Sequence, residues 1–156
     1  MKVLLCDVDG VLNSREFFLS LKDPPLEPAD RISEDLVSRL NVILDETVAV
    51  PILSSSWRHM GHLPVLNSMF VLKGLRHPFA GKTPWLGVGV PRGEEIQAWL
   101  DKHTEVENFV ILDDDLDFGE KMIPHLIHVD PKHGLQDADV KKAIAMLNKT
   151  SDQLSG

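Results

Sequence analysis

Acidic side chains stand at two widely separated places in the chain, each directly after a short apolar run. Asp7 and Asp9 follow the run 3–6, and the neighbours Asp113 and Asp114 follow another such run. Alternate side chains of an extended segment point the same way, so Asp7 and Asp9 face one side. Carboxylates gathered at one place repel each other unless a cation lies among them, and short acids suit a hard ion such as Mg²⁺. We therefore expect these four aspartates to form a magnesium site.

Each acidic pair has a simpler explanation when it is taken alone. An isolated Asp-x-Asp-Gly sequence is often only a turn, and two adjacent acids after a strand are often the exposed start of a helix. A calcium loop also begins with spaced acids, but Val11 and Phe18 occupy positions where that loop needs oxygen ligands. A third polar cluster, the serine run 54–56, also follows an apolar run. Three such clusters favour a functional site over three unrelated turns.

The surrounding pattern predicts an α/β fold with a doubly wound parallel sheet. Helices with apolar residues at helical spacing alternate with short apolar strands, which is typical of parallel sheets covered on both faces. Ser33 is expected to cap the first long helix, and Pro51 weakens the second strand because proline cannot donate a ladder hydrogen bond. The predicted strands are 3–6, 48–53, 69–72, 108–112 and 125–129, the predicted helices are 34–46, 59–67, 93–103 and 137–148, and segments 14–31 and 74–91 are predicted to be largely irregular.

The three polar clusters are expected to meet at one edge of this sheet. Each cluster comes directly after a predicted strand, and the carboxyl ends of parallel strands share an edge. Ligands of such sheets bind just beyond that edge. The sequence thus predicts one binding site built from three distant segments.

The composition is that of an ordinary globular domain. The 156 residues suit a single domain over 1–150, with a flexible tail over 151–156. The single cysteine, Cys6, rules out an internal disulfide and a thiolate-rich zinc site. With no apolar run long enough to cross a membrane, we expect a cytoplasmic protein. The net charge of −8 argues against strong binding to nucleic acid, although a local basic pocket stays compatible with it.

Several segments together resemble the haloacid dehalogenase (HAD) superfamily. Residues 7–13 (DVDGVLN) resemble its first signature motif, residues 52–58 (ILSSSWR) the second, and residues 110–114 (VILDD) the fourth. Segments 92–100 (RGEEIQAWL) and 130–135 (DPKHGL) resemble a small capless branch that includes domains of RNA-repair proteins. The resemblance implies a HAD-like Rossmannoid fold, and the short segments between motifs leave no room for a large cap.

The resemblance also implies roles for the acids. Asp7 would be the nucleophile that forms an aspartyl-phosphate, which divides one difficult displacement into two steps. Asp9 would be the general acid and then the general base, and its backbone carbonyl would help to hold Mg²⁺. Asp114 is the best match to the family's metal ligand, with Asp113 beside it, and Asp117 would hold a metal-bound water or support the loop.

The residues that would contact the phosphoryl group are less sharply defined. Either Ser54, which ends the apolar run, or Ser55, two residues before the tryptophan, would donate to the phosphoryl oxygens. The family's basic residue is either Arg92 at a helix start, which the branch pattern favours, or Lys82 in the irregular segment. Arg58 would either reach the phosphate or pair with an acid.

These features together predict a Mg²⁺-dependent phosphomonoester hydrolase with an open site. An open site suits an extended, possibly macromolecular, phosphorylated substrate. Two other readings stay open: a catalytically silent domain that binds phosphate or metal, and a phosphotransferase. Trp57 and Trp85 flank the expected site and could stack on a base, whereas Trp99 at helical spacing is expected in the core. The sequence does not determine the substrate or the oligomeric state.

Overall fold

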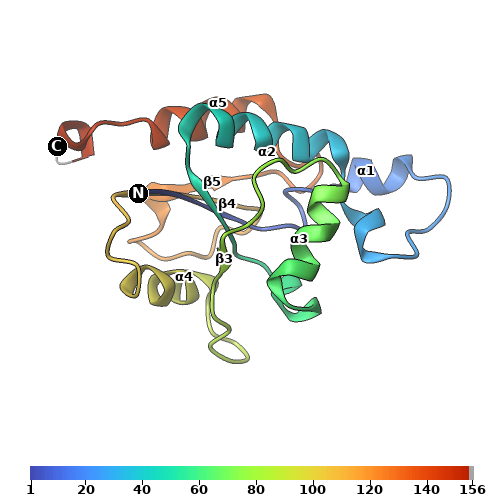
Figure 1. Ribbon diagram of the computed structural model, residues 1–156, viewed down its shortest axis with the longest axis horizontal. Coiled ribbons are helices and arrows are strands. Elements are labelled where there is room, and N and C mark those ends of the chain that lie inside the picture. The colour runs from blue at the N-terminus through green and yellow to red at the C-terminus, as the bar shows by residue number, and fades with distance from the viewer. Residues whose placement is uncertain (155–156) are drawn as a thin grey trace.

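A five-stranded parallel sheet forms the centre of the molecule (Figure 1). The computed structural model describes residues 1–154. The strand order is β3-β2-β1-β4-β5, and every neighbouring pair is parallel. The strands are β1 (Lys2–Cys6), β2 (Val50–Leu53), β3 (Gly81–Lys82), β4 (Asn108–Asp113) and β5 (Leu126–His128). This confirms the predicted α/β class and the four main predicted strands.

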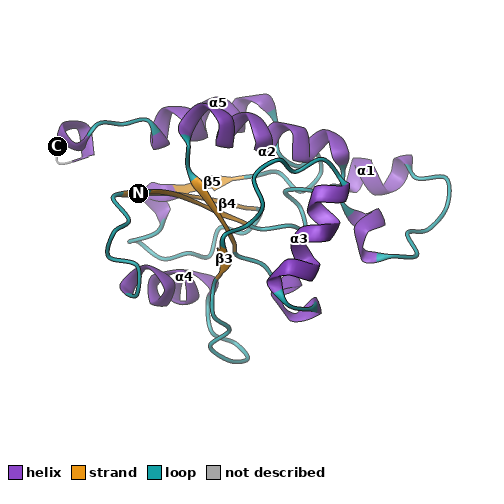
Figure 2. Ribbon diagram, in the orientation of Figure 1, coloured by secondary structure: helices purple, strands orange, loops and turns teal. Residues whose placement is uncertain are grey.

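Helices cover both faces of the sheet (Figure 2). Ser33 caps the longest of them, because its hydroxyl accepts a hydrogen bond from the amide of Leu36 as the sequence predicted. The α-helices are α1 (Arg15–Ser20), α2 (Glu34–Thr47), α3 (Leu63–Leu72), α4 (Arg92–Asp101), α5 (Asp137–Leu147) and α6 (Ser151–Leu154), and short 3₁₀ helices span Pro28–Arg31, Ser56–Met60 and Ile123–His125. None of the described helices is long and apolar enough to cross a membrane.

The two faces of the sheet carry separate apolar cores. Side chains such as Leu4 on β1 pack with α2, α3 and α5 on one face, and side chains such as Leu5 pack with α4 on the other. In Figure 1, α2 and α5 lie together on one side of the sheet and α4 lies on the opposite side. Alternate residues of a strand point to opposite faces, so both faces of β1 are apolar, as a strand buried on both faces requires.

The strand order places a topological switch point beside β1. The sheet grows from β1 to β2 on one side and from β1 to β4 on the other. Ligands bind at such a point in doubly wound sheets, because loops leave the two neighbouring strands in opposite directions and open a crevice. Asp7 directly follows β1, Asp113 is the last residue of β4 and Asp114 follows it, so these three acids border the crevice.

Three local predictions differ from the structure. The strand predicted at 69–72 is wrong, because these residues form the last turns of α3, where Phe70 is buried while Val71 and Leu72 are exposed. The helix predicted from 59 begins only at Leu63, after a 3₁₀ turn. The irregular segment 74–91 contains β3, whose two residues carry too short a pattern to be recognised.

Pro51 does lie in β2 despite its missing amide hydrogen. It is in register with Leu4 of β1, and its carbonyl accepts a hydrogen bond from Ala80 at 2.9 Å. The neighbour β3 begins only at Gly81, opposite Ile52, so the proline stands before the ladder between β2 and β3 starts.

No separate cap domain is built into the described part of the chain. The segment between β1 and α2 holds only α1 and a 3₁₀ turn, and the segment between β2 and α4 holds α3, β3 and a loop. The predicted tail contributes the helical turn α6 over residues 151–154, and residues 155–156 lie outside the described part. The flexibility of the tail stays a prediction.

Candidate active site

Backbone hydrogen bonds carry the alignment of the strands past the end of the sheet. The amide of Asp7 donates to the carbonyl of Leu112 at 3.0 Å, and the amide of Ser54 donates to the carbonyl of Cys6 at 2.9 Å. These bonds fix the first residues after β1 and β2 against their neighbours. The three polar clusters therefore lie at one edge, as their positions after the strands predicted.

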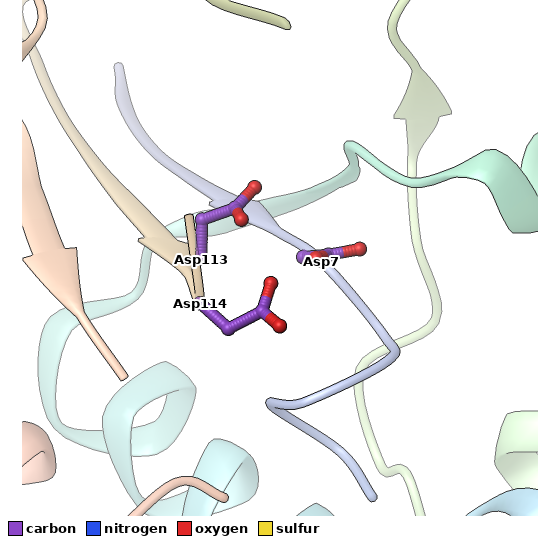
Figure 3. Close-up of side chains that lie close together, drawn as sticks. All are labelled: Asp7, Asp113 and Asp114. Carbon is purple, nitrogen blue, oxygen red and sulfur yellow. The ribbon is translucent and has the colours of Figure 1, made fainter. Parts of the chain in front are cut away.

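Three carboxylates gather at the switch point (Figure 3). Asp7, Asp113 and Asp114 each offer an oxygen, and these oxygens lie within 4.8 Å of one another. Asp7 is 4% exposed and Asp113 is fully buried. Buried carboxylates at this spacing repel one another, and their hard oxygen donors fit a divalent cation such as Mg²⁺. We call Asp7, Asp113 and Asp114 the aspartate triad.

Gly10 allows the loop after β1 to pass close to the aspartate triad. Its φ of +84° lies in the left-handed region, and a Cβ built on it would lie 2.5 Å from Oδ2 of Asp114. A side chain at this position would therefore meet both backbone strain and a carboxylate oxygen. The DVDG sequence thus supplies the space that Asp114 occupies as well as the acids.

Arg92 is the cation of the aspartate triad. Its Nη1 lies 3.0 Å from Oδ2 of Asp7 and 2.9 Å from Oδ2 of Asp113. Burial and, to a smaller extent, the charge of Asp113 raise the pKa of Asp7 to about 8, although Arg92 opposes the rise. Burial also raises the pKa of Asp113, again against the effect of Arg92. One arginine thus only partly offsets the negative charge, which leaves the triad suited to a further cation.

Asp9 lies apart from the aspartate triad and is held by two donors. It is exposed, and its Oδ1 accepts hydrogen bonds from Nδ2 of Asn13 at 2.9 Å and from Nε1 of Trp57 at 3.1 Å. Both donors use the same oxygen, which leaves Oδ2 for another partner. Asp9 was predicted as a metal ligand together with the triad, but its carboxylate does not belong to this group of three. A contact between Asp9 and the metal through its backbone carbonyl stays a prediction.

The structure separates the two candidate serines. The hydroxyl of Ser55 accepts a hydrogen bond from the amide of Trp57 at 3.2 Å and so caps a 3₁₀ turn. Ser54 is fully buried, and its Oγ has no hydrogen-bond partner within the described chain. An unpaired buried hydroxyl is costly unless a ligand completes it. Ser54 is therefore the better candidate for a contact with substrate.

The structure also separates the three basic candidates. Arg92 reaches the aspartate triad, whereas Lys82 donates to the carbonyls of Arg58 at 3.3 Å and Gly61 at 3.5 Å. Nη2 of Arg58 lies 2.9 Å from both carboxylate oxygens of Glu95 in a buried ion pair. Of the two expectations for Arg58, the pairing with an acid is the one that the structure contains.

A cavity of about 490 Å³ opens above the aspartate triad. The loop 85–91 forms one wall of it, and the base of this loop is held by a hydrogen bond from the amide of Leu86 to Glu95 at 3.0 Å. Asp9, Arg58, Arg92 and Asp117 also line it, whereas Ser54, Ser55 and Lys82 do not. The cavity therefore brings together the candidate nucleophile, acid and cation, with Lys82 and both candidate serines outside its lining.

Sequence reasoning missed several residues that shape the site. Trp57 was considered as a stacking platform, but the structure buries it and directs its N–H to Asp9. Asn13 and Glu95 carried no role in the sequence analysis. Asn13 lies within the first motif and could have been noticed there, whereas no local signal pairs Glu95 with a residue 37 positions away.

The family comparison agrees with this geometry. A family model described as "HAD domain in Swiss Army Knife RNA repair proteins" matches residues 3–140. No curated protein and no solved structure matches the chain. The family suggests a phosphatase-type hydrolase, and the aspartate triad is compatible with the divalent metal that such domains typically use. The match covers most of the sequence and every element of the site, so the chain belongs to the HAD domains of RNA-repair proteins.

Proposed function

We propose that this protein is a Mg²⁺-dependent hydrolase of phosphate monoesters. The observation that supports it most strongly is the aspartate triad, with Arg92 bridging two of its carboxylates at the switch point of the sheet. Asp7, Asp113 and Asp114 would hold the cation, which would offset negative charge on the phosphoryl oxygens.

Asp7 is the nucleophile in this proposal. One of its carboxylate oxygens attacks phosphorus, the ester P–O bond breaks, and the leaving oxygen takes a proton from Asp9. A water molecule then attacks the aspartyl-phosphate and gives its proton back to Asp9, and inorganic phosphate leaves. The amide of Val8 donates to Oδ1 of Asp7 at 2.8 Å and Arg92 contacts Oδ2, so both oxygens are oriented before the reaction.

Ser54 and Arg92 bind the phosphoryl group in this proposal. The hydroxyl of Ser54, which is buried beside the cavity lining, would donate to a phosphoryl oxygen once substrate opens the way to it, and would so gain the partner that it lacks. The guanidinium of Arg92 keeps its charge because burial, which opposes ionisation, is outweighed by Asp7 and Asp113, which raise the pKa of Arg92. These preorganised donors stabilise the charge that develops during transfer.

The substrate of this hydrolase is an extended phosphate ester. No cap domain encloses the cavity in the described residues, so a long leaving group can pass out of the site. The family description refers to RNA-repair proteins, which makes a phosphorylated RNA end the first macromolecular substrate to examine.

Replacement of the nucleophile tests the proposal. Asp7→Asn should lower the hydrolysis of an aryl phosphate by at least about a thousandfold, because asparagine cannot form the covalent intermediate. Asp35→Asn, an exposed aspartate on α2, is the matched control and should keep full activity. Turnover that survives in Asp7→Asn would refute the assignment, and wild-type protein that binds Mg²⁺ but hydrolyses no ester would point to a silent binding domain.

A further inference from the structure

A second pocket adjoins the acidic cavity and has the opposite character. It has a volume of about 390 Å³ and shares Arg58 and Trp85 with the cavity above the aspartate triad. Its lining includes basic side chains, among them His59, Lys82 and Lys102. Within residues 1–154, no acidic side chain lines this pocket, although the chain carries 24 acids against 16 lysines and arginines. We call it the basic pocket.

The two lysines of the basic pocket are not neutralised by ion pairs within the described residues. Arg58 is neutralised by Glu95, but neither Lys82 nor Lys102 forms an ion pair with a carboxylate in the part of the chain that the structure describes. Lys82 donates only to two backbone carbonyls, and Lys102 is exposed. The net charge of this surface is therefore positive, and it suits an anion.

The helix α4 sets the distance between the two pockets. Arg92 at its first residue contacts the aspartate triad, and Lys102 directly follows its last residue. A helix of ten residues is about 15 Å long. One phosphate group cannot contact both ends, so a ligand that occupies both pockets is an extended molecule with at least two anionic groups.

Trp85 stands where the two pockets meet. Its side chain is 56% exposed, it lines both pockets, and His59 contacts it edge-on with ring centroids 5.5 Å apart. An exposed indole is a surface on which a planar base stacks, and such stacking tolerates any base because every base has a flat face. The order of acid site, indole and basic pocket matches a phosphate, a base and a more distant phosphate of one nucleotide chain.

We propose that the basic pocket binds a second phosphate of the substrate, an internal phosphodiester on the leaving-group side of the ester that Asp7 attacks. This inference rests on the proposed function for the reaction at Asp7, but the binding itself does not require turnover. Lys102 and Lys82 supply the charge, and Trp85 stacks on a base between the two phosphates, which are more than one nucleotide apart because one nucleotide is too short to span α4. The pocket gives an acidic protein one local surface for a polyanion.

Lys102 and His103 also have a purely structural explanation. Cations near the C-terminal end of a helix stabilise its dipole, and the ring of His103 stacks on Trp99 with centroids 3.8 Å apart. That role would change the free energy of unfolding but not the affinity for a ligand or its dependence on salt. The test therefore measures binding as well as stability.

The first measurement is the affinity for a fluorescent RNA tetranucleotide without terminal phosphates, followed by anisotropy in Mg²⁺ at several salt concentrations. Lys102→Gln should raise the Kd about three- to tenfold and make the slope of log K against log salt shallower by about 0.7, the value for one lost contact to a single strand. Trp85→Ala should also raise the Kd, without changing the salt slope. Lys142→Gln, an exposed lysine on α5, should change neither quantity.

The second measurement compares substrates. The ratio of kcat/KM for a terminally phosphorylated tetranucleotide to that for an aryl phosphate should fall in Lys102→Gln by the same factor as the affinity. A nucleoside bisphosphate is too short to span α4. The ratio of its kcat/KM to that of an aryl phosphate should therefore change little in Lys102→Gln. If Lys102→Gln lowered the kcat/KM ratio of the bisphosphate as much as that of the tetranucleotide, the ligand would not need to be a nucleotide chain.

The outcomes separate the two proposals. A tetranucleotide that does not bind, or that binds wild type and Lys102→Gln with the same Kd and salt slope, overturns the basic pocket even if aryl phosphates are hydrolysed. Binding that depends on Lys102 in a protein without phosphatase activity supports the pocket and contradicts the proposed function.

Discussion

At the scale of single residues, the site depends on how its acids are held. Asp7 has both oxygens occupied, by the amide of Val8 and by Arg92. Asp9 has one oxygen bound by Trp57 and Asn13 and the other free of these donors. A fixed nucleophile and a proton carrier with one free oxygen are what the proposed two-step reaction needs.

The indole of Trp57 is expected to position Asp9. Trp57→Phe keeps the aromatic contact with Phe70, whose ring centroid lies 5.9 Å away, but removes the N–H donor. The kcat for an aryl phosphate should fall about three- to tenfold, as expected for one lost hydrogen bond to a charged group that is partly solvated. The KM should change little, because this hydrogen bond holds the proposed proton carrier rather than the substrate.

A purely structural role of Trp57 would give a different result. In that case the thermal midpoint would fall, while kcat measured well below that midpoint would stay at the wild-type value. A kcat that is unchanged, in a variant whose thermal midpoint is also unchanged, would likewise show that the hydrogen bond does not position Asp9.

At the scale of elements, α4 connects the parts of the site. Its first residue, Arg92, reaches the aspartate triad, Glu95 pairs with Arg58, and Ile96 and Trp99 lie in the core beneath the sheet. Glu95 also accepts from Leu86 and so anchors the loop that walls the cavity. The position of this helix therefore fixes the cation, the wall and the basic pocket together.

The buried pair of Arg58 and Glu95 should be costly to break. Glu95→Leu conserves most of the volume but leaves a buried guanidinium without its carboxylate, so the free energy of unfolding should fall by about 3–5 kcal/mol. Denaturant unfolding measures this loss. The double variant Arg58→Leu/Glu95→Leu should recover much of it, because it leaves no buried charge unpaired. A single variant as stable as wild type would show that the pair is not buried in solution.

At the scale of the whole molecule, the aspartate triad makes the stability of the metal-free fold depend on pH. In the folded state the pKa of Asp7 is about 8, against about 4 in an unfolded chain. Between these values the folded state binds more protons than the unfolded state, so stability falls as pH rises. The molecule thus gives up stability to place negative charge where the proposed function needs it.

This linkage can be measured by chemical unfolding in the presence of a chelator. The contribution of Asp7 should lower the free energy of unfolding by about 3–4 kcal/mol between pH 5 and pH 8. Asp7→Asn, which cannot ionise, should lose much less over the same range and should be the more stable protein at pH 8. Added Mg²⁺ should reduce the decline in wild type, because the cation binds the ionised carboxylates. Identical pH profiles for wild type and Asp7→Asn without metal would contradict this account.

The sequence by itself determined the features that depend on neighbouring residues. Apolar runs fixed the main strands, Ser33 fixed the start of α2, and acids directly after β1 and β4 could only lie at the carboxyl edge of a parallel sheet. Strand periodicity and chain order carry this information, because a parallel sheet places all its strand ends on one side. For the same reason the meeting of Asp7, Asp113 and Asp114 could be expected from the sequence, which grouped Asp9 with them as well.

Only the tertiary structure decided between residues with similar chemistry. It placed Arg92 rather than Lys82 on Asp7, left Ser54 rather than Ser55 without a partner, and gave Arg58 to Glu95. Each of these outcomes depends on which distant segments pack together. The residues next to a cation or a hydroxyl in the sequence do not indicate which group it will contact. The basic pocket has the same origin, because the 3₁₀ turn after β2, β3 and the end of α4 contribute its charges and meet only in the folded chain.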